Sequence, residues 1–461
     1  MRIFFFIHQP YILTCMNSKI PILKTLIALA TPIMLQSFLQ NSLSFFDTLM
    51  ISQLGDEKVA AVGIAVQLIF IFNMIQFGLQ TGLSINTSQY YGKGDYNSIK
   101  KILGIQILFS VVSLALLWIA IFVLPDHILS LYTDDIRIKD TAKSYLQING
   151  ASLLFAILIN SYTLNLRSTN VVNLPTIASG ISVFINLGLN YVFIFGWGAI
   201  PAQGANGAAL ATAIARFANL AILLFFTYKF KYIAAASIKE MINFDSEFIK
   251  KTFKVTWPVV LNESIWVLGV SLYSWVYARM GTQSLAAVNI CTSIENVLYT
   301  PFFGMFAAGS VLIGNQIGRG DTSQAKESAK LIIIMHTLLA IFTGIILIAL
   351  RVPIMRIYNV SETTMYYCSR ILIIIGITMG LKMLDYTFTV SIFRGGGDTK
   401  FSLFLDFSGV WLIGVPISLI AGMIFKIPVY WLVGLVKIEH FYKILLAWVR
   451  YKKDKWIRKV I

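Results

Sequence analysis

The chain repeats part of its sequence at a constant offset, without a gap. Pro32 returns as Pro258, and Gly55 returns as Gly281. Longer matches join Ala60-Ala61-Val62 to Ala286-Ala287-Val288 and Gly92-Lys93-Gly94-Asp95 to Gly318-Arg319-Gly320-Asp321. The sequence between them is mostly apolar. We therefore predict a duplicated bundle of membrane helices, an architecture common among secondary transporters.

The composition supports a membrane protein. Hydrophobic residues make up 57% of the chain and charged residues 13%, whereas about 25% is usual for a soluble domain. The net charge of +16 does not indicate nucleic-acid binding, because the basic residues lie in short connectors between apolar runs and not on one face.

The cysteines and histidines lack the spacing of a metal site or a disulfide framework. They are Cys15, Cys291, Cys368, His8, His127, His336 and His440. Cys291 and Cys368 fall in apolar helical stretches, where a small buried hydrophobic role is expected. We expect no cofactor, no catalytic residue and no metal beyond a possible coupling Na⁺.

The first 20 residues do not resemble a signal peptide, because Pro10 follows the short apolar run and no cleavage site of small residues appears. We expect residues 1–20 to form a disordered extension, with Met16 a plausible start of the native chain.

Twelve apolar segments are long enough to cross a membrane. They are residues 25–51, 58–83, 102–124, 142–165, 174–197, 207–228, 255–277, 284–312, 329–350, 366–393, 401–424 and 428–448. The charged linker 229–254 separates an N-terminal lobe, residues 21–228, from a C-terminal lobe, residues 255–448, which a basic tail, residues 449–461, follows. Six spans in each half make the two repeats parallel in the membrane, related by a pseudo-two-fold.

The distribution of Lys and Arg predicts the orientation. Counted with the N-terminus inside, 25 of the 37 lie in inside segments and 9 in outside loops. This bias predicts that both termini lie in the cytoplasm and that the protein is a multi-pass protein of the cell membrane. The tail can lie against anionic lipid.

The Gly-X-Gly-Asp sequences that end at Asp95 and Asp321 predict tight turns, because Gly tolerates positive φ and Asp bonds the local backbone. No ATP-binding motif occurs, so coupling to an ion gradient is expected.

Asp47 lies near the outer end of the first span, where a charge is costly and therefore a candidate for function. A desolvated carboxylate can bind a proton near neutral pH or coordinate Na⁺. Its repeat equivalent is Tyr273, so the scaffold itself does not demand a carboxylate there. A helix-end residue close to the headgroups is the alternative interpretation.

Three acidic residues of the second half lie within spans: Glu263, Glu295 and Asp385. Each is a candidate for a substrate site or a second cation site, or else for a polar helix contact. Lys382 lies three residues before Asp385 on one helix face, so mutual neutralisation is expected.

Near the start of span eleven, Asp406 is expected to pair with Arg394.

In span five, Asn186 and Asn190 are four residues apart and share a helix face. Their amides can bind a cation or join helices. Further polar residues that could line the same cavity are Gln36, Asn41, Thr212 and Asn262.

These residues resemble the multidrug and toxic compound extrusion (MATE) transporters over about residues 20–460. The resemblance rests on Pro32, Phe46-Asp47-Thr48, Leu54-Gly55, Gly204 to Thr212, Pro258, Glu263, Trp266, Gly281, Ala286-Ala287, Gly314, Gly318, Gly320, Arg394 to Thr399, Trp411 and Pro416.

The resemblance implies an antiporter with two six-helix lobes around a V-shaped central cavity, which exchanges Na⁺ or H⁺ for organic cations. It implies a cation site at Asp47, Asn186, Asn190 and Thr212. It places a second site at Glu263 and, less directly, at Glu295 and Asp385. Relatives often carry Asp where this chain has Asn190, and neutral oxygens favour Na⁺ over H⁺.

The expected partners are small organic cations and membrane lipid, and the protein is expected to be a monomer. Two alternatives stay open. A flippase for lipid-linked oligosaccharides would need a strongly cationic cavity, and only Arg216 and Lys382 lie within central spans. An intramembrane prenyl transferase would need Asp-rich sites, and the one cluster, Asp134, Asp135 and Asp140, lies in an outside loop.

Overall fold

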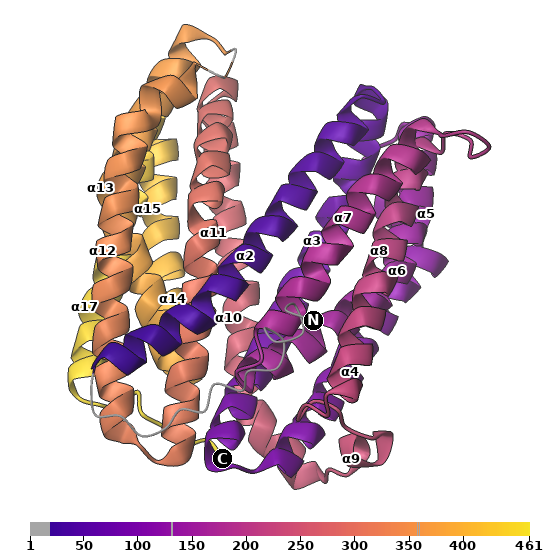
Figure 1. Cartoon of the computed structure of the whole chain (residues 1–461). Helices are drawn as coiled ribbons and strands as arrows, with labels where there is room; N and C mark the ends of the chain where they lie inside the picture. The colour runs from indigo at the N-terminus through magenta and orange to yellow at the C-terminus, as the bar shows by residue number, and fades with distance from the viewer. Residues whose placement is uncertain (1–18, 131, 357, 359) are drawn as a thin grey trace. The chain divides into compact units, whose positions relative to one another are not determined.

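The structure is a computed structural model that describes residues 19–461, except residues 131, 357 and 359 (Figure 1). Throughout this part of the chain the regular structure is helical, apart from one isolated β-bridge between Trp197 and Ile200. The prediction of an all-α membrane protein is confirmed. Residues 1–18 of the predicted N-terminal extension lie outside the described residues.

The chain divides into two compact units. Among the described residues, unit 1 is Leu35–Phe253, and unit 2 is Lys254–Ile461 together with the start of α2, up to Met34. The linker predicted at residues 229–254 therefore belongs almost entirely to unit 1.

Unit 1 contains the remainder of α2, the helices that follow it and the first turns of the helix after the linker. Its helices are α2 (Lys19–Ser52), α3 (Asp56–Lys93), α4 (Tyr96–Trp118), η1 (Ile119–Val123), α5 (Pro125–Ser130), α6 (Ile136–Ser168), α7 (Asn173–Phe195), α8 (Gly204–Lys229) and α9 (Ile238–Ile242). The η label marks π-helical geometry.

Unit 2 contains the remaining helices. They are α10 (Ser246–Arg279), α11 (Thr282–Arg319), α12 (Thr322–Met355), α13 (Glu362–Tyr386), η2 (Thr387–Arg394), α14 (Thr399–Gly409), η3 (Val410–Gly414), α15 (Val415–Leu419), η4 (Ile420–Ile424), α16 (Val429–Val436) and α17 (Ile438–Lys452).

The sequence repeat is also a repeat of helix boundaries. Helices α3 and α11 both have 38 residues, and they begin and end at equivalent positions of the sequence repeat. Each ends at a left-handed glycine, Gly94 with φ 79° and Gly320 with φ 88°. Asp95 and Asp321 then cap the next helix by accepting a hydrogen bond from the backbone N–H three residues on. The predicted tight turns are confirmed.

Eleven helices of the described residues are long and apolar enough to cross a membrane, and they match the first eleven predicted spans. The twelfth predicted span, residues 428–448, is instead two helices that meet at Lys437. Helix α16 has 8 residues, about 12 Å of rise, which is less than half of a hydrocarbon core. Helix α17 carries Glu439, His440 and Lys443 in its first two turns, and these charges break the apolar run.

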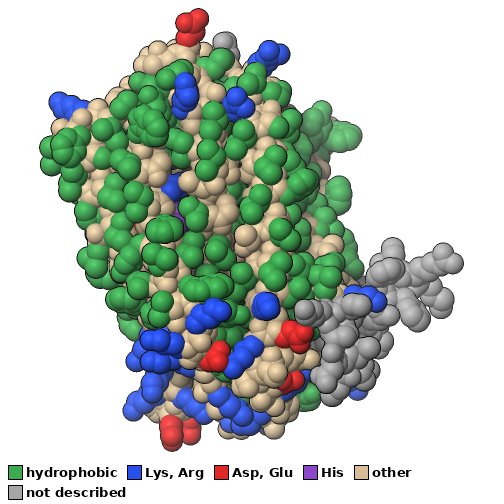
Figure 2. Space-filling model, turned by 90° about the vertical axis from the view of Figure 1, so that its left-hand side faces the viewer, with side chains coloured by type: hydrophobic (Ala, Val, Ile, Leu, Met, Phe, Trp, Pro, Cys, Tyr) green, Lys and Arg blue, Asp and Glu red, His purple; other side chains and the backbone are tan. Residues whose placement is uncertain are grey.

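Large hydrophobic side chains on the surface fit a lipid environment. Leu116, Val123 and Ile345 are among the most exposed of them, at 67%, 69% and 61%. Figure 2 shows a face on which hydrophobic side chains cover most of the height, while Lys and Arg side chains gather toward its lower end. Hydrocarbon accepts such a surface, whereas water would penalise it.

The linker packs on unit 1 through an ion pair and a helix cap. Lys100 of α4 lies 2.6 Å from Glu240 of α9, and Ser237 forms a capping box with Glu240. The Lys100 hydrogen bond and the Ser237 donors lower the pKa of Glu240 to about 2. A Cβ on Gly104 would lie 2.0 Å from the carbonyl oxygen of Met241, so α9 approaches the α4 backbone closely.

The basic C-terminal segment packs on unit 2. Trp456 is fully buried, and the backbone N–H of Arg458 donates to the carbonyl of Gly396 at 2.8 Å. Asp398 receives Arg450 at 2.8 Å and Arg458 at 3.2 Å. Two basic side chains of the tail, Arg450 and Arg458, are therefore paired with a carboxylate of unit 2.

Glycines let α12 and α13 approach closely. A Cβ on Gly344 would lie 2.3 Å from the carbonyl oxygen of Gly376, and a Cβ on Gly376 would lie 2.8 Å from the carbonyl oxygen of Gly344. Small residues at a helix crossing allow this backbone contact in a membrane.

Gly344→Ala is expected to destabilise the protein by about 1–3 kcal/mol, because the helices must separate to admit the methyl group. Thermal unfolding of the purified protein in detergent measures the loss. Gly63→Ala is the matched control, since nothing lies within 4 Å of an added Cβ in α3. Equal melting temperatures for the two variants would contradict the assigned contact.

Candidate functional site

A series of polar contacts crosses unit 1 from α2 to α8. The amide nitrogen of Asn190 donates to Asp47 Oδ1 at 2.5 Å and to Asn186 Oδ1 at 2.8 Å. The amide nitrogen of Asn186 donates in turn to Thr212 Oγ1 at 3.2 Å. The structure thus brings together all four residues predicted for the cation site, from α2, α7 and α8. We call these residues the Asp47 group.

Local structure explains why the group assembles. Asn186 and Asn190 are one helical turn apart on α7, and both are fully buried. Gly207 brings α8 against α7, because a Cβ there would lie 2.3 Å from the carbonyl oxygen of Phe193. The Gly204–Thr212 sequence therefore sets the distance between the helices that carry the amides and the hydroxyl.

An arginine lies one turn beyond Thr212 on α8. Arg216 Nη1 donates to Asn149 Oδ1 at 2.8 Å and to Ser152 Oγ at 2.6 Å, both on α6. The sequence showed Arg216 inside a span but not these partners, because they lie on a different helix, far from it in the chain.

The other predicted cavity residues lie in different surroundings. Gln36 donates to Ser179 Oγ and accepts from Arg167 Nη2, both at 2.7 Å, so it acts as a bridge between helices of unit 1. Asn41 is exposed. Asn262 belongs to unit 2, where it is buried and neither amide atom has a hydrogen-bond partner among the described residues.

Glu263, on α10, lies against an arginine. Its Oε1 accepts from Arg394 Nη1 at 2.6 Å, and the two side chains are 12% and 7% exposed. The expected pairing of Arg394 with Asp406 is wrong, because Arg394 lies at the end of η2 beside α10, and Asp406 lies 3.1 Å from Lys443 instead.

Glu295, on α11, meets two lysines. Its Oε1 lies 3.3 Å from Lys382 Nζ and 3.7 Å from Lys437 Nζ, and it also accepts from the hydroxyl of Tyr299. Lys382 additionally lies over the Tyr299 ring, 4.2 Å from its centroid. The nearest carboxylate to Lys382 is therefore Glu295 and not Asp385, its neighbour on the same helix.

Asp385 is surrounded by residues of α17. Its Oδ2 lies 2.5 Å from Lys443 Nζ and 2.8 Å from His440 Nδ1. Sequence reasoning missed His440 and Lys443 as part of any site. The signal that could have found them is the presence of charged side chains inside the last predicted span.

Cysteines, histidines and carboxylates do not converge on a metal site in the part of the chain that the structure describes. No cluster of three or more His, Cys, Asp or Glu side chains there could hold a metal ion. Cys291 and Cys368 are free thiols and are buried, as predicted. Cys15 lies outside the described residues.

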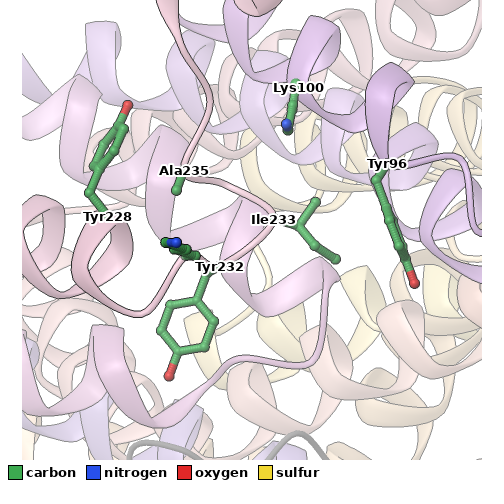
Figure 3. A pocket seen from close by; sticks show the side chains of 7 residues that line it. Tyr96, Lys100, Tyr228, Tyr232, Ile233 and Ala235 are labelled. Carbon is green, nitrogen blue, oxygen red and sulfur yellow. The ribbon is translucent and has the colours of Figure 1, made fainter.

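A pocket of about 430 Å³ lies at the start of the linker in unit 1 (Figure 3). The start of α4, the end of α8 and the loop after it supply its lining: Tyr96, Lys100, Tyr228, Lys231, Tyr232, Ile233 and Ala235. None of the residues predicted for a site lines it. This pocket is therefore separate from the Asp47 group.

Proteins with similar sequences are named as multidrug resistance proteins. A "Probable multidrug resistance protein NorM" of Thermotoga maritima is 23% identical over 443 residues, which cover 95% of this chain and 94% of that protein. The "Multidrug resistance protein MdtK" of Edwardsiella ictaluri is 23% identical over 454 residues, covering 94% and 97%.

Solved structures share the fold. A Vibrio cholerae MATE transporter, VcmN, solved as a mutant, superposes with a TM-score of 0.87 at 18% identity, covering 96% of this chain and 99% of that one. A MOP superfamily transporter from Pyrococcus furiosus gives a TM-score of 0.84 at 17% identity, covering 96% and 100%.

A family model settles the membership. The model described as MatE matches the chain twice, at residues 32–192 and 258–420. The two matches begin at equivalent positions of the sequence repeat, Pro32 and Pro258, and together span more than two thirds of the chain. The chain is thus a multi-pass membrane protein and a transporter, not an enzyme, and it belongs to the multidrug and toxic compound extrusion (MATE) family.

Proposed function

We propose that the protein is a secondary antiporter of the plasma membrane that exports organic, mostly cationic compounds in exchange for Na⁺ or H⁺. The observation that carries this proposal is the Asp47 group, in which a chain of hydrogen bonds joins a carboxylate, two buried amides and a hydroxyl on three helices. The names of the relatives, multidrug resistance proteins, support drug-like substrates.

The Asp47 group offers the chemistry that ion coupling needs. A carboxylate inside a membrane protein is costly while charged, so binding a cation or a proton stabilises it. Asn186, Asn190 and Thr212 each carry an oxygen that can serve a hard cation as a ligand. In this proposal Asp47 holds the ion, and the three neutral residues position the carboxylate and complete the ligand set.

Neutral oxygens favour Na⁺ in this proposal. Na⁺ needs several oxygen ligands but little net charge, and amides supply oxygens without titrating. A proton relay would need further groups that titrate, and the polar series continues from Asp47 through the amides of Asn190 and Asn186.

We propose that the substrate or second cation site draws on the residues that the sequence predicts: Glu263, Glu295, Asp385, Gln36, Asn41 and Asn262. Of these, Glu263 is the strongest candidate, because a partly exposed carboxylate attracts organic cations. Arg394 competes with such a cation, so binding would have to displace or share this ion pair.

The flippase alternative finds less support. A pyrophosphate needs free cationic side chains, whereas Lys382 lies against Glu295 and Arg216 donates to Asn149 and Ser152. These two are the basic residues that the sequence places in central spans.

Asp47→Asn is expected to abolish ion-driven efflux while leaving the protein folded, because the amide keeps the size of the side chain but cannot carry the charge that exchanges with the cation. Drug accumulation in expressing cells and thermal unfolding of the purified variant measure the two properties. Asp126→Asn is the control, since Asp126 is an exposed partner of Lys143. Normal efflux by a well-expressed Asp47→Asn variant would exclude the proposed role.

The choice of ion is testable in liposomes. We expect an imposed Na⁺ gradient at equal pH to drive drug movement, because the Asp47 group is rich in neutral oxygens. A pH gradient without Na⁺ is the parallel experiment on the same vesicles. Drug movement under the pH gradient alone would assign coupling to protons.

Glu263→Gln is expected to weaken export of cationic drugs more than export of neutral ones, because it removes the attracting charge. The double variant Glu263→Gln/Arg394→Gln is the control, since it also removes the arginine that the single change leaves unpaired. Equal losses for both drug classes, with recovery in the double variant, would leave the pair a structural role only.

A further inference from the structure

Unit 2 buries a lysine between two carboxylates. Lys443 Nζ, from α17, lies 2.5 Å from Asp385 Oδ2 on α13 and 3.1 Å from Asp406 Oδ1 on α14. The side chains of Lys443 and Asp385 are 1% and 0% exposed. An ammonium group with three donors is thus held by carboxylates from two other helices, out of reach of water.

Protein groups contact both carboxylate oxygens of Asp385. Its Oδ2 receives Lys443 and also lies 2.8 Å from His440 Nδ1. Its Oδ1 accepts from Thr389 Oγ1 at 3.4 Å. A metal cation at Asp385 would compete with these protein groups for the carboxylate oxygens.

The backbone is shaped to admit the lysine. A Cβ on Gly409 of α14 would lie 2.6 Å from Cδ and 2.7 Å from Cγ of Lys443, so no larger residue fits beside its stem. A Cβ on Gly414 of η3 would likewise meet the Tyr273 hydroxyl and Glu439. Tyr273 donates to Glu439 at 2.6 Å in that space. Two glycines in one helical segment therefore make room for buried polar contacts.

The carboxylates and ammonium groups around Lys443 nearly balance one another in charge. Glu295 faces Lys382 and Lys437, and Glu439 lies 3.8 Å from His440 Nε2. Together with Asp385, Asp406 and the buried lysine, this cluster holds four carboxylates and three ammonium groups. The ammonium groups therefore offset three of the four carboxylate charges within the protein itself.

We propose that Lys443 is a tethered cation: its ammonium group occupies the place between Asp385 and Asp406 that a coupling ion would take, and unit 2 therefore binds no exchangeable metal cation. This inference rests on the proposed function, since it leaves ion exchange to the Asp47 group. Lys443 then has a positioning role: its ammonium group permanently neutralises and holds Asp385 and Asp406, as a bound metal cation would do only while it stays bound.

The test measures stability in full-length protein in which Asp47→Asn has already removed the first site. Thermal unfolding is compared in about 150 mM Na⁺ and in choline at equal ionic strength. We expect no Na⁺ effect in this background. Adding Lys443→Met is expected to lower the apparent Tm by about 10 °C in choline, because two buried carboxylates lose their partner. Na⁺ is expected to restore about 3 °C or more by filling the vacated place.

Three further variants sharpen the test in the same background. Lys443→Arg keeps the charge and is expected to show no Na⁺ response. Gly409→Ala, which crowds the lysine stem, is expected to lower the Tm more than Gly434→Ala, where the nearest side-chain atom lies at 3.5 Å. Asp385→Asn is expected to leave the absence of a Na⁺ effect unchanged.

Two results overturn the proposal. One is a folded Lys443→Met variant that gains no stability from Na⁺. The other is a saturable Na⁺ stabilisation of the Asp47→Asn protein that Asp385→Asn abolishes; this second comparison decides the matter even if Lys443→Met does not fold. Because every variant lacks Asp47 and the measurement is stability, neither result depends on whether the protein is an antiporter.

Discussion

Burying an unpaired charge in hydrocarbon costs free energy, so a charged side chain is stable there only where the protein supplies a partner. The polar contacts in the interior of both units follow from this constraint. In unit 2 the partners are themselves charged: Arg394 meets Glu263, and Lys443 meets Asp385. In unit 1 the acid meets an amide, because Asn190 donates to Asp47. An amide neutralises no charge. The hydrogen bond from Asn190 stabilises the Asp47 carboxylate, whereas the unit-2 carboxylates named here pair with basic side chains of the same unit.

The duplication conserves the scaffold and changes the chemistry. Helices α3 and α11 keep the same length and the same glycine turns, since these depend on backbone geometry. The polar residues do not repeat: the equivalent of Asp47 is Tyr273, which donates to Glu439. Under the proposed function, a single exchangeable ion site in unit 1 is enough, because the unit-2 carboxylates pair with basic side chains of their own unit.

The sequence predicted the helical scaffold and the proximity of the four residues of the Asp47 group, but not the partners of the charged residues in unit 2. Apolar length and turn glycines are local properties, and Asn186 and Asn190 are one turn apart, so their shared face follows from the helix period. The pairs of unit 2 join residues far apart in the chain, such as Glu263 and Arg394. Periodicity tells which face a residue occupies, but not which helix lies opposite. Lys443 adds a second reason, since a lysine near the end of a span is expected to extend to the surface.

The irregular helices of unit 2 explain how so many charges fit into one bundle. Segments η2 and η3 are π-helical, and they follow the ends of α13 and α14 directly, close to Asp385 and Gly409. A π-helical turn is wider than an α-helical turn and changes the direction of the side chains that follow it. Here the wide turns coincide with glycines that admit Lys443 and Tyr273. The π-helical turns and these glycines therefore lie where the buried lysine and its carboxylates pack, and the missing Cβ atoms leave the space that the Lys443 stem occupies.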